Sequence, residues 1–212
     1  MWQEVAEVVT RSLFVSGTAT ILAASWSIPI AMVLTAKESE FRKVLLDVMN
    51  TFVAIPTVLI GLVLYLLLSR SGPLGFFGIL YTPTSIIIGE AILITPLIVS
   101  FSASVLRDTR AGIWEMAVSM GATERQALVT MVAESFPRLL TAVLLGFNRA
   151  IGELGVALML GGNIKGLTQV MTTAIALEVS KGEFELALTF GGILLLVTFA
   201  VTVIVRKVGK TI

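Results

Sequence analysis

The sequence predicts an all-α integral membrane protein that forms a single domain, residues 1–212, with five transmembrane helices. The first observation behind this prediction is composition, because 56% of the residues are hydrophobic and only 14% are charged, whereas a soluble domain has about 25% charged residues. The second is a series of apolar stretches of about 20 residues, the length that a helix needs to cross a bilayer. The third is that no low-complexity tract or linker divides the chain.

Five apolar stretches have this length, and each is predicted to cross the membrane once. The five are residues 12–36, 48–69, 84–106, 139–161 and 186–205. Glu90 interrupts the third stretch, and Arg149 and Glu153 interrupt the fourth of the series, whereas the other three carry no charge. The chain begins with two acidic residues before its first basic one, unlike a cleavable signal peptide, so we expect the first span to be retained.

The distribution of Lys and Arg between the loops predicts the orientation, because cytoplasmic loops carry an excess of these residues. One side has ten of them: Lys37, Arg42, Lys43, Arg107, Arg110, Arg125, Arg138, Arg206, Lys207 and Lys210. The other side has four: Arg11, Arg70, Lys165 and Lys181. We therefore expect the N-terminus outside, the C-terminus in the cytoplasm, and a multi-pass protein of the plasma membrane.

Two connecting regions are too long to be simple turns. On the outside, residues 166–177 form an uncharged run of twelve residues, which is too short to cross and suits a re-entrant or interfacial helix. On the inside, residues 107–138 form a cytoplasmic segment. Its apolar residues have helical spacing on both sides of Gly121, and Thr123 and Gln126 fit a capping box that starts a new helix. Taken alone, this segment could also be an amphipathic loop lying on the headgroups.

Glu115, Met116 and Ala117, followed after three residues by Gly121, resemble the EAA motif of ABC importer permeases, with Met116 in place of the first alanine. In that family this segment is the coupling helix that docks in a cleft of the cytoplasmic ATPase. The resemblance implies that the ATPase-coupling residues here are Glu115, Met116, Ala117, Gly121 and Ala122. Residues 54–61 likewise resemble the Pro-x-x-x-x-Gly core helix of these permeases.

Residues 147–155 and 159–163 resemble the Arg-x-x-Gly-Glu-x-Gly and Gly-Asn motifs of importers for molybdate, tungstate and sulfate, and residues 162–185 are most similar to tungstate permeases. The resemblance implies alternating access in an assembly of two copies of this chain, two ABC ATPase subunits and an extracytoplasmic solute-binding protein. ATP and Mg would be bound by the partner ATPase, since the chain has no phosphate-binding Gly-x-x-x-x-Gly-Lys-Ser/Thr run. We expect no cofactor in this chain and no nucleic-acid partner.

Arg149 is predicted at the bilayer midplane, ten residues into its span, where a charge must face protein or water. Glu153 is one helical turn further on and within reach for pairing. The pair could be a purely structural ion pair, or Arg149 could line the translocation pathway and offset the desolvation of an oxyanion. A pathway needs only a weak site, because the anion must leave as readily as it enters.

Three further residues are candidates for the pathway: Glu90, Asn148 and Asn163. For Glu90 we expect an interhelical hydrogen bond or pairing with Arg149 rather than a proton relay. The two asparagines could contact oxyanion oxygens or simply hydrogen-bond between helices.

The composition also bears on alternative functions. The chain has no Cys and no His, which removes thiolate and imidazole metal ligands and every Ser-His or Cys-His catalytic pair. An intramembrane enzyme is therefore disfavoured, and we expect neither catalytic residues nor a metal site. An ion-coupled secondary carrier using Glu90, Arg149 and Glu153 stays open as an alternative, although it gives the cytoplasmic helix pair no purpose.

Overall fold

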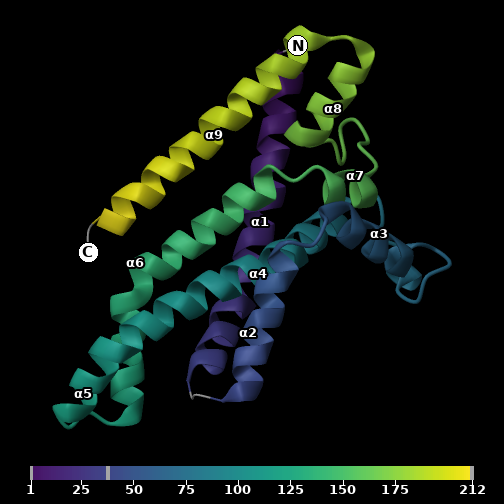
Figure 1. The fold of residues 1–212 in the computed structure, drawn as a ribbon. Coiled ribbons are helices and arrows are strands. Elements are labelled where there is room, and N and C mark those ends of the chain that lie inside the picture. Colours follow the sequence, from purple (N-terminus) through teal and green to yellow (C-terminus); the bar gives the residue numbers. More distant parts are fainter. Residues whose placement is uncertain (1, 37–38, 211–212) are drawn as a thin grey trace.

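The computed structural model describes residues 2–36 and 39–210, and every regular element in this part of the chain is helical (Figure 1). Lys37, which we assigned to the cytoplasmic side, lies outside the described residues. Four helices are long and apolar enough to cross a membrane: α1 (Trp2–Thr35), α4 (Pro83–Thr109), α6 (Glu124–Ile151) and α9 (Phe184–Lys210). The prediction of an all-α membrane protein is confirmed.

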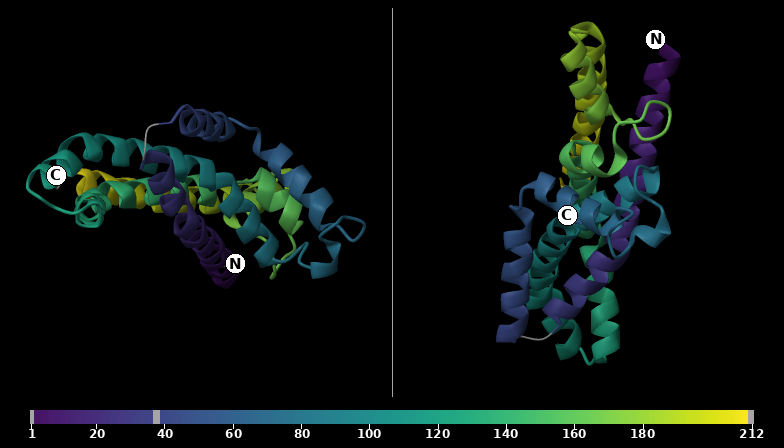
Figure 2. Two further views of the ribbon diagram at one scale, coloured as in Figure 1. Left: turned by 90° about the horizontal axis from the view of Figure 1, so that it is seen from below. Right: turned by 90° about the vertical axis from the view of Figure 1, so that its right-hand side faces the viewer.

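The shorter elements complete the fold. They are α2 (Glu40–Val53), α3 (Thr57–Leu68), the 3-10 turn η1 (Gly75–Phe77), the π-helix η2 (Arg110–Trp114), α5 (Glu115–Ser119), α7 (Gly155–Gly161) and α8 (Met171–Lys181). The N-terminus, α8 and the start of α9 lie at one end of the molecule, and the start of α2 and the α5–α6 turn lie at the other (Figures 1 and 2).

α1 and α4 form the centre of the fold and pack against each other along most of their length. The buried face of α1 consists largely of small residues, among them Ala19, Ala23 and Ala31, which are fully buried. Small side chains allow two helix backbones to approach closely, which is how helices associate where no water drives them together. α1 is also ten residues longer at its start than the predicted span 12–36, because it begins at Trp2.

The predicted span 48–69 is not one straight helix. α2 and α3 meet at an angle of 99° at the break between them. Pro56 causes the break, because proline has no N–H to donate and disfavours helical geometry in the residue before it. α3 has 12 residues and is therefore about 18 Å long. It is too short to cross the hydrocarbon core of about 30 Å alone.

The predicted span 139–161 is also broken. α6 begins at Glu124 and ends at Ile151, so that it joins the second cytoplasmic helix and the first half of the span without a boundary at residue 139. Pro137 lies inside α6 without ending it. After a break at Gly152 the chain resumes as the seven-residue helix α7.

α7 lies between α3 and α4, and glycine makes this close contact possible. A Cβ built on Gly89 of α4 would lie 2.5 Å from the side chains of both Val156 and Leu160. A Cβ on Gly61 of α3 would lie 3.0 Å from Cβ of Met159. These residues belong to or adjoin a core cluster that α7 shares with α1, α3 and α4.

The run 166–177, expected to form a short helix, gives α8, which begins five residues later than the uncharged run and ends at Lys181. Its first residues are buried against α1 and α9, in a cluster that includes Met171, Ala174, Val5 and Phe190. Whether α8 enters the membrane stays a prediction.

Candidate functional site

The segment with the resemblance to the coupling helix lies at the end of the molecule opposite the N-terminus (Figure 1). α4 continues through the π-helix η2 into α5, and a tight turn then leads into α6. Gly121 has a φ of +87°, and the N–H groups of Ala122 and Gly121 donate to the carbonyl oxygens of Ala117 and Val118, both at 3.0 Å. This is a Schellman motif, in which glycine supplies the left-handed residue that ends a helix.

The start of α6 is fixed by the capping box expected from the sequence. The N–H of Gln126 donates to Oγ1 of Thr123 at 3.3 Å, and the N–H of Thr123 donates to Oε1 of Gln126 at 2.9 Å. The prediction of two helices that meet at Gly121, with a new helix beginning just after it, is therefore confirmed.

The α5–α6 turn presents apolar side chains on the surface. Met116 is 59% exposed and Met120 81% exposed, and Val118 and Glu115 are exposed beside them, while Ala117 is half-buried. Methionine is common at protein contact surfaces because its flexible, polarizable side chain adapts to a partner. A rigid turn carrying exposed methionines is suited to bind a protein rather than a small ligand.

The second candidate region is the break between α6 and α7. Nη1 of Arg149 lies 2.6 Å from Oε2 of Glu153, so the predicted pairing is confirmed. The Glu153 side chain is only 3% exposed, whereas the Arg149 side chain is 40% exposed. The buried carboxylate is thus the inner member of the pair, and the guanidinium reaches the surface of the chain.

Glu153 also determines how the break is built. Its Oε1 accepts a hydrogen bond from the N–H of Val156 at 3.2 Å, which satisfies a free donor at the start of α7. Its backbone carbonyl accepts from Oγ1 of Thr172 in α8 at 2.8 Å. A Cβ on Gly155 would lie 2.8 Å from Oγ1 of Thr57 and 3.2 Å from Oε1 of Glu153. Glu153 therefore connects α6, α7 and α8.

Among the described residues, the other predicted pathway residues make no hydrogen bond or ion pair with Arg149. Glu90 is 1% exposed in α4, and its Oε2 has no hydrogen-bond partner. Of the two expected contacts it has the interhelical one, with the Ser16 side chain of α1, and the charge of Glu153 also acts on it. Asn148 donates from Nδ2 to Oγ1 of Thr202 at 3.2 Å, which is a contact between α6 and α9. Asn163 lies after α7 in a left-handed conformation, with φ of +52°.

Two of these residues keep an unused acceptor. Oδ1 of Asn148 and Oδ1 of Asn163 are buried without a hydrogen-bond partner. Among the described residues, no group of His, Cys, Asp and Glu is arranged to hold a metal ion.

Sequence reasoning missed the residues that tie α8 to the rest of the chain. Oγ of Ser12 in α1 accepts a hydrogen bond from the N–H of Met171, the first residue of α8, at 2.8 Å. Arg11 donates to the carbonyl oxygens of Gln169 and Gly166. Lys165 lies 2.6 Å from Glu4, and this hydrogen bond raises the pKa of Lys165. Partners about 160 positions apart leave no local signal.

Comparison with known proteins agrees with this architecture. Residues 21–212 match the family described as "Binding-protein-dependent transport system inner membrane component". The tungstate uptake system permease protein TupB of Peptoclostridium acidaminophilum is 36% identical over 207 residues, which cover 98% of this chain and 91% of that protein. TupB of Campylobacter jejuni is 33% identical over 174 residues, covering 82% of this chain and 73% of that protein.

Similarity also extends to a probable anion ABC transporter permease of Haloferax volcanii, 36% identical over 195 residues, which cover 90% of this chain and 84% of that protein. A chain of the MetNI methionine ABC transporter has the same fold, with a TM-score of 0.76 at 18% identity and coverage of 98% of this chain and 97% of that one. The chain belongs to the family of inner membrane components of binding-protein-dependent transport systems, and is a multi-pass protein of the plasma membrane.

Proposed function

We propose that this chain is the permease subunit of an ABC importer that moves an oxyanion, tungstate by preference, into the cytoplasm. The observation that supports the choice of substrate is the 36% identity with a tungstate uptake permease over 98% of the chain. The observation that carries the mechanism is the rigid α5–α6 turn, whose exposed methionines suit a protein partner.

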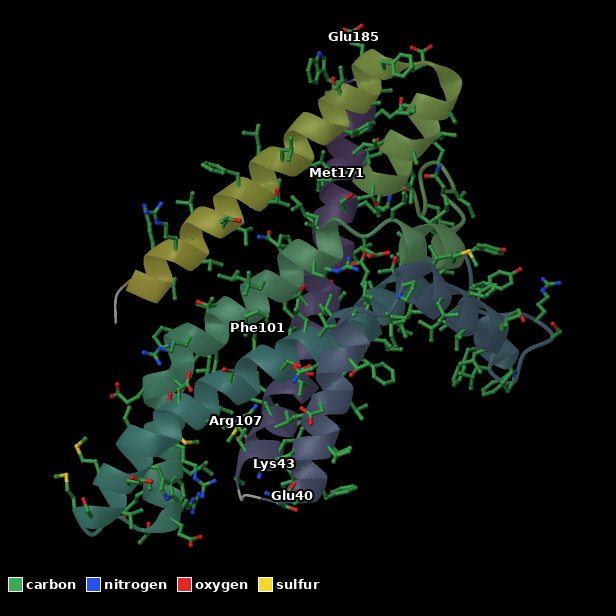
Figure 3. The ribbon with its side chains drawn as sticks, viewed as in Figure 1. Glu40, Lys43, Phe101, Arg107, Met171 and Glu185 are labelled. Atoms are coloured by element: carbon green, nitrogen blue, oxygen red, sulfur yellow. The ribbon has the colours of Figure 1, made fainter. Side chains whose placement is uncertain are left out.

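In this proposal the turn around Glu115, Met116, Ala117, Gly121 and Ala122 docks on a cytoplasmic ATPase, and two copies of the chain associate with two ATPases and an extracytoplasmic binding protein. The places of two basic residues support this orientation. Lys43 and Arg107 lie toward the end that carries α5, and Glu185 and Met171 lie toward the opposite end (Figure 3). The end with the turn would thus face the cytoplasm, with the N-terminus outside.

The ATPase would transmit its closure through α4 and α6, both of which are continuous with the turn. Arg149 is 25 residues beyond Glu124, the first residue of α6, which corresponds to about 37 Å along the helix. A displacement of the turn would therefore reach the break at Gly152 through one rigid element. This gives a physical route for alternating access.

Arg149 would face the pathway. A side chain that is 40% exposed on this chain cannot face lipid at low cost if it carries a charge. Pairing with Glu153 reduces the net charge, so that Arg149 would guide an oxyanion without holding it tightly. The other candidate pathway residues, Glu90, Asn148 and Asn163, contribute in this proposal through their unused acceptors or as packing groups.

The second candidate substrates are molybdate and sulfate. A molybdenum transport permease of Bacillus subtilis is 28% identical over 61% of this chain, and the sulfate permease CysT of Escherichia coli is 26% identical over the whole chain. These identities are lower than that with TupB, which favours tungstate.

The proposal is tested by uptake into vesicles that contain the complex of this chain with its ATPase and binding protein. Radioactive or mass-detected tungstate should accumulate only with ATP. Unlabelled tungstate should compete at lower concentration than molybdate or sulfate. More effective competition by molybdate or sulfate would reassign the substrate, and accumulation driven by an ion gradient without the ATPase would replace the importer with a secondary carrier.

A further inference from the structure

Arg110 joins the end of α1 to the segment that carries α5. Its Nη1 donates to the carbonyl oxygen of Thr35 at 2.6 Å and also to that of Ala36. The last carbonyl groups of a helix have no partner within the helix, and a cation beside them is favoured by the helix dipole. The last turn of α1 contains no basic residue. Arg110 therefore caps α1 from another element.

The π-helix holds the guanidinium in this position. Cζ of Arg110 lies 5.4 Å from the ring centroid of Trp114, which is the last residue of the same π-helix. A cation over an aromatic ring is attracted by it. π-helices are rare, appear mostly as single turns inside α-helices, and are frequent at functional sites. A change in the π-helix would thus change the place of the guanidinium.

Polar contacts between α1 and this segment are few, although Ala31 of α1 and Trp114 belong to one apolar cluster. In the described part of the chain, the side-chain hydrogen bonds between α1 and residues 107–123 are those of Arg110. A cavity of about 380 Å³ lies beside them, and Met32 and Thr35 of α1 line it together with Trp114 and Met131. The π-helix itself packs on α4 and α6. Arg110 thus supplies the polar link between the end of α1 and the π-helix, beside the apolar packing.

We infer that Arg110 is a positioning residue that makes the end of α1 follow the α5 segment when the ATPase displaces it. This inference rests on the proposed function. α1 packs along α4, and its Ser12 binds the start of α8 at the other end of the molecule. A movement passed to α1 would therefore reach the end that carries α8 by a route separate from α6.

The test compares Arg110→Gln and Arg110→Lys with the wild-type chain in the assembled complex in vesicles, with ATP hydrolysis and tungstate uptake measured on the same sample. Glutamine removes the cation, so the ratio of tungstate imported to ATP hydrolysed should fall about fivefold or more, the usual size of a coupling effect. Lysine keeps a cation that can donate to carbonyl groups and should restore most of the ratio. ATP hydrolysis itself should stay within about twofold of wild type, since the substitution weakens the link to α1 and leaves the α5–α6 turn that contacts the ATPase unchanged.

Arg107→Gln is the matched control. Arg107 lies three residues earlier, is exposed, and makes no side-chain hydrogen bond within the described residues. Its substitution should leave the ratio unchanged. An unchanged ratio in Arg110→Gln, an equal loss in Arg107→Gln, or a loss explained by failure to co-purify with the ATPase would each overturn the inference. ATP-independent uptake by the wild-type complex would instead overturn the proposed function, so the two failures are distinguishable.

Discussion

Removing either member of the Arg149–Glu153 pair should have unequal effects on stability, because the two side chains differ in burial. Glu153 is 3% exposed and Arg149 is 40% exposed. Arg149→Gln leaves a buried carboxylate without its partner, which should cost about 3 kcal/mol, the low end for a broken buried pair because Arg149 is partly solvated. Glu153→Gln leaves a guanidinium that can turn to water and keeps an acceptor for the N–H of Val156, so the cost should be about 1 kcal/mol.

The assay is thermal unfolding of the purified chain in one detergent, followed by circular dichroism. For a chain of this length about 1 kcal/mol corresponds to about 2–4 °C, so Arg149→Gln should lower the midpoint by about 6–12 °C and Glu153→Gln by about 2–4 °C. The double variant should resemble Glu153→Gln, because it contains no buried carboxylate that lacks a partner. A larger loss for Glu153→Gln than for Arg149→Gln would refute the reasoning.

Three further outcomes are expected. Gly121→Val should destabilise the turn by about 1–2 kcal/mol, because the φ of Gly121 is +87°, and should reduce ATPase binding in co-purification. Gly121→Asn should have a milder effect. Gly112→Ala should bind the ATPase as wild type, because Gly112 has no positive φ and an added Cβ would have no atom within 4 Å. Gly89→Ala should lower the unfolding midpoint because its Cβ would clash with side chains of α7. Gly17→Ala, whose added Cβ would have no atom within 4 Å, should raise the midpoint by removing a flexible residue from a helix. Equal shifts for the two variants would contradict the close packing of α4 and α7. Glu90→Gln should leave the midpoint unchanged or raise it, since a neutral amide is less costly to bury than a carboxylate and can still interact with Ser16; a large loss of stability would contradict this reasoning.

The sequence predicted the parts of the fold that depend on local pattern. Apolar length gave the long helices, and residue spacing gave the turn at Gly121 and the capping box at Thr123. The i,i+4 spacing also gave the Arg149–Glu153 pair. All of these depend on residues within one or two helical turns, which is why a single sequence was sufficient.

The breaks in the predicted spans were harder to predict. Pro137 lies inside α6 and leaves it continuous, whereas Pro56 separates α2 from α3. Proline alone therefore does not show whether a helix ends. At Gly152 the outcome depends on Glu153, whose buried carboxylate finds a donor at the start of α7 and whose carbonyl finds Thr172 in α8. Such contacts depend on the tertiary structure and cannot be read from the local sequence.

Glu90 shows the limit for polar residues in a span. Its place in the sequence indicated that it must avoid lipid, and it is indeed buried. Of the two expected contacts it has the interhelical one, with Ser16 of α1, and not the one with Arg149, although the charge of Glu153 acts on it. The sequence allowed several polar partners for Glu90, and the packing of α1 on α4 determines that Ser16 is the one in contact.

The hydrogen bond from Met171 to Ser12 has a consequence for how the protein is made. A chain is synthesised from its N-terminal side, so Ser12 enters the membrane 159 residues before its donor, Met171. The hydroxyl of Ser12 donates to the carbonyl oxygen of Val8 in its own helix, but until then its acceptor has no partner. The guanidinium of Arg11, whose acceptors are Gln169 and Gly166, must likewise be accommodated by the insertion machinery, by water or by lipid headgroups. The nascent chain would thus remain recognisable to membrane quality control until residues 166–171 have been translated.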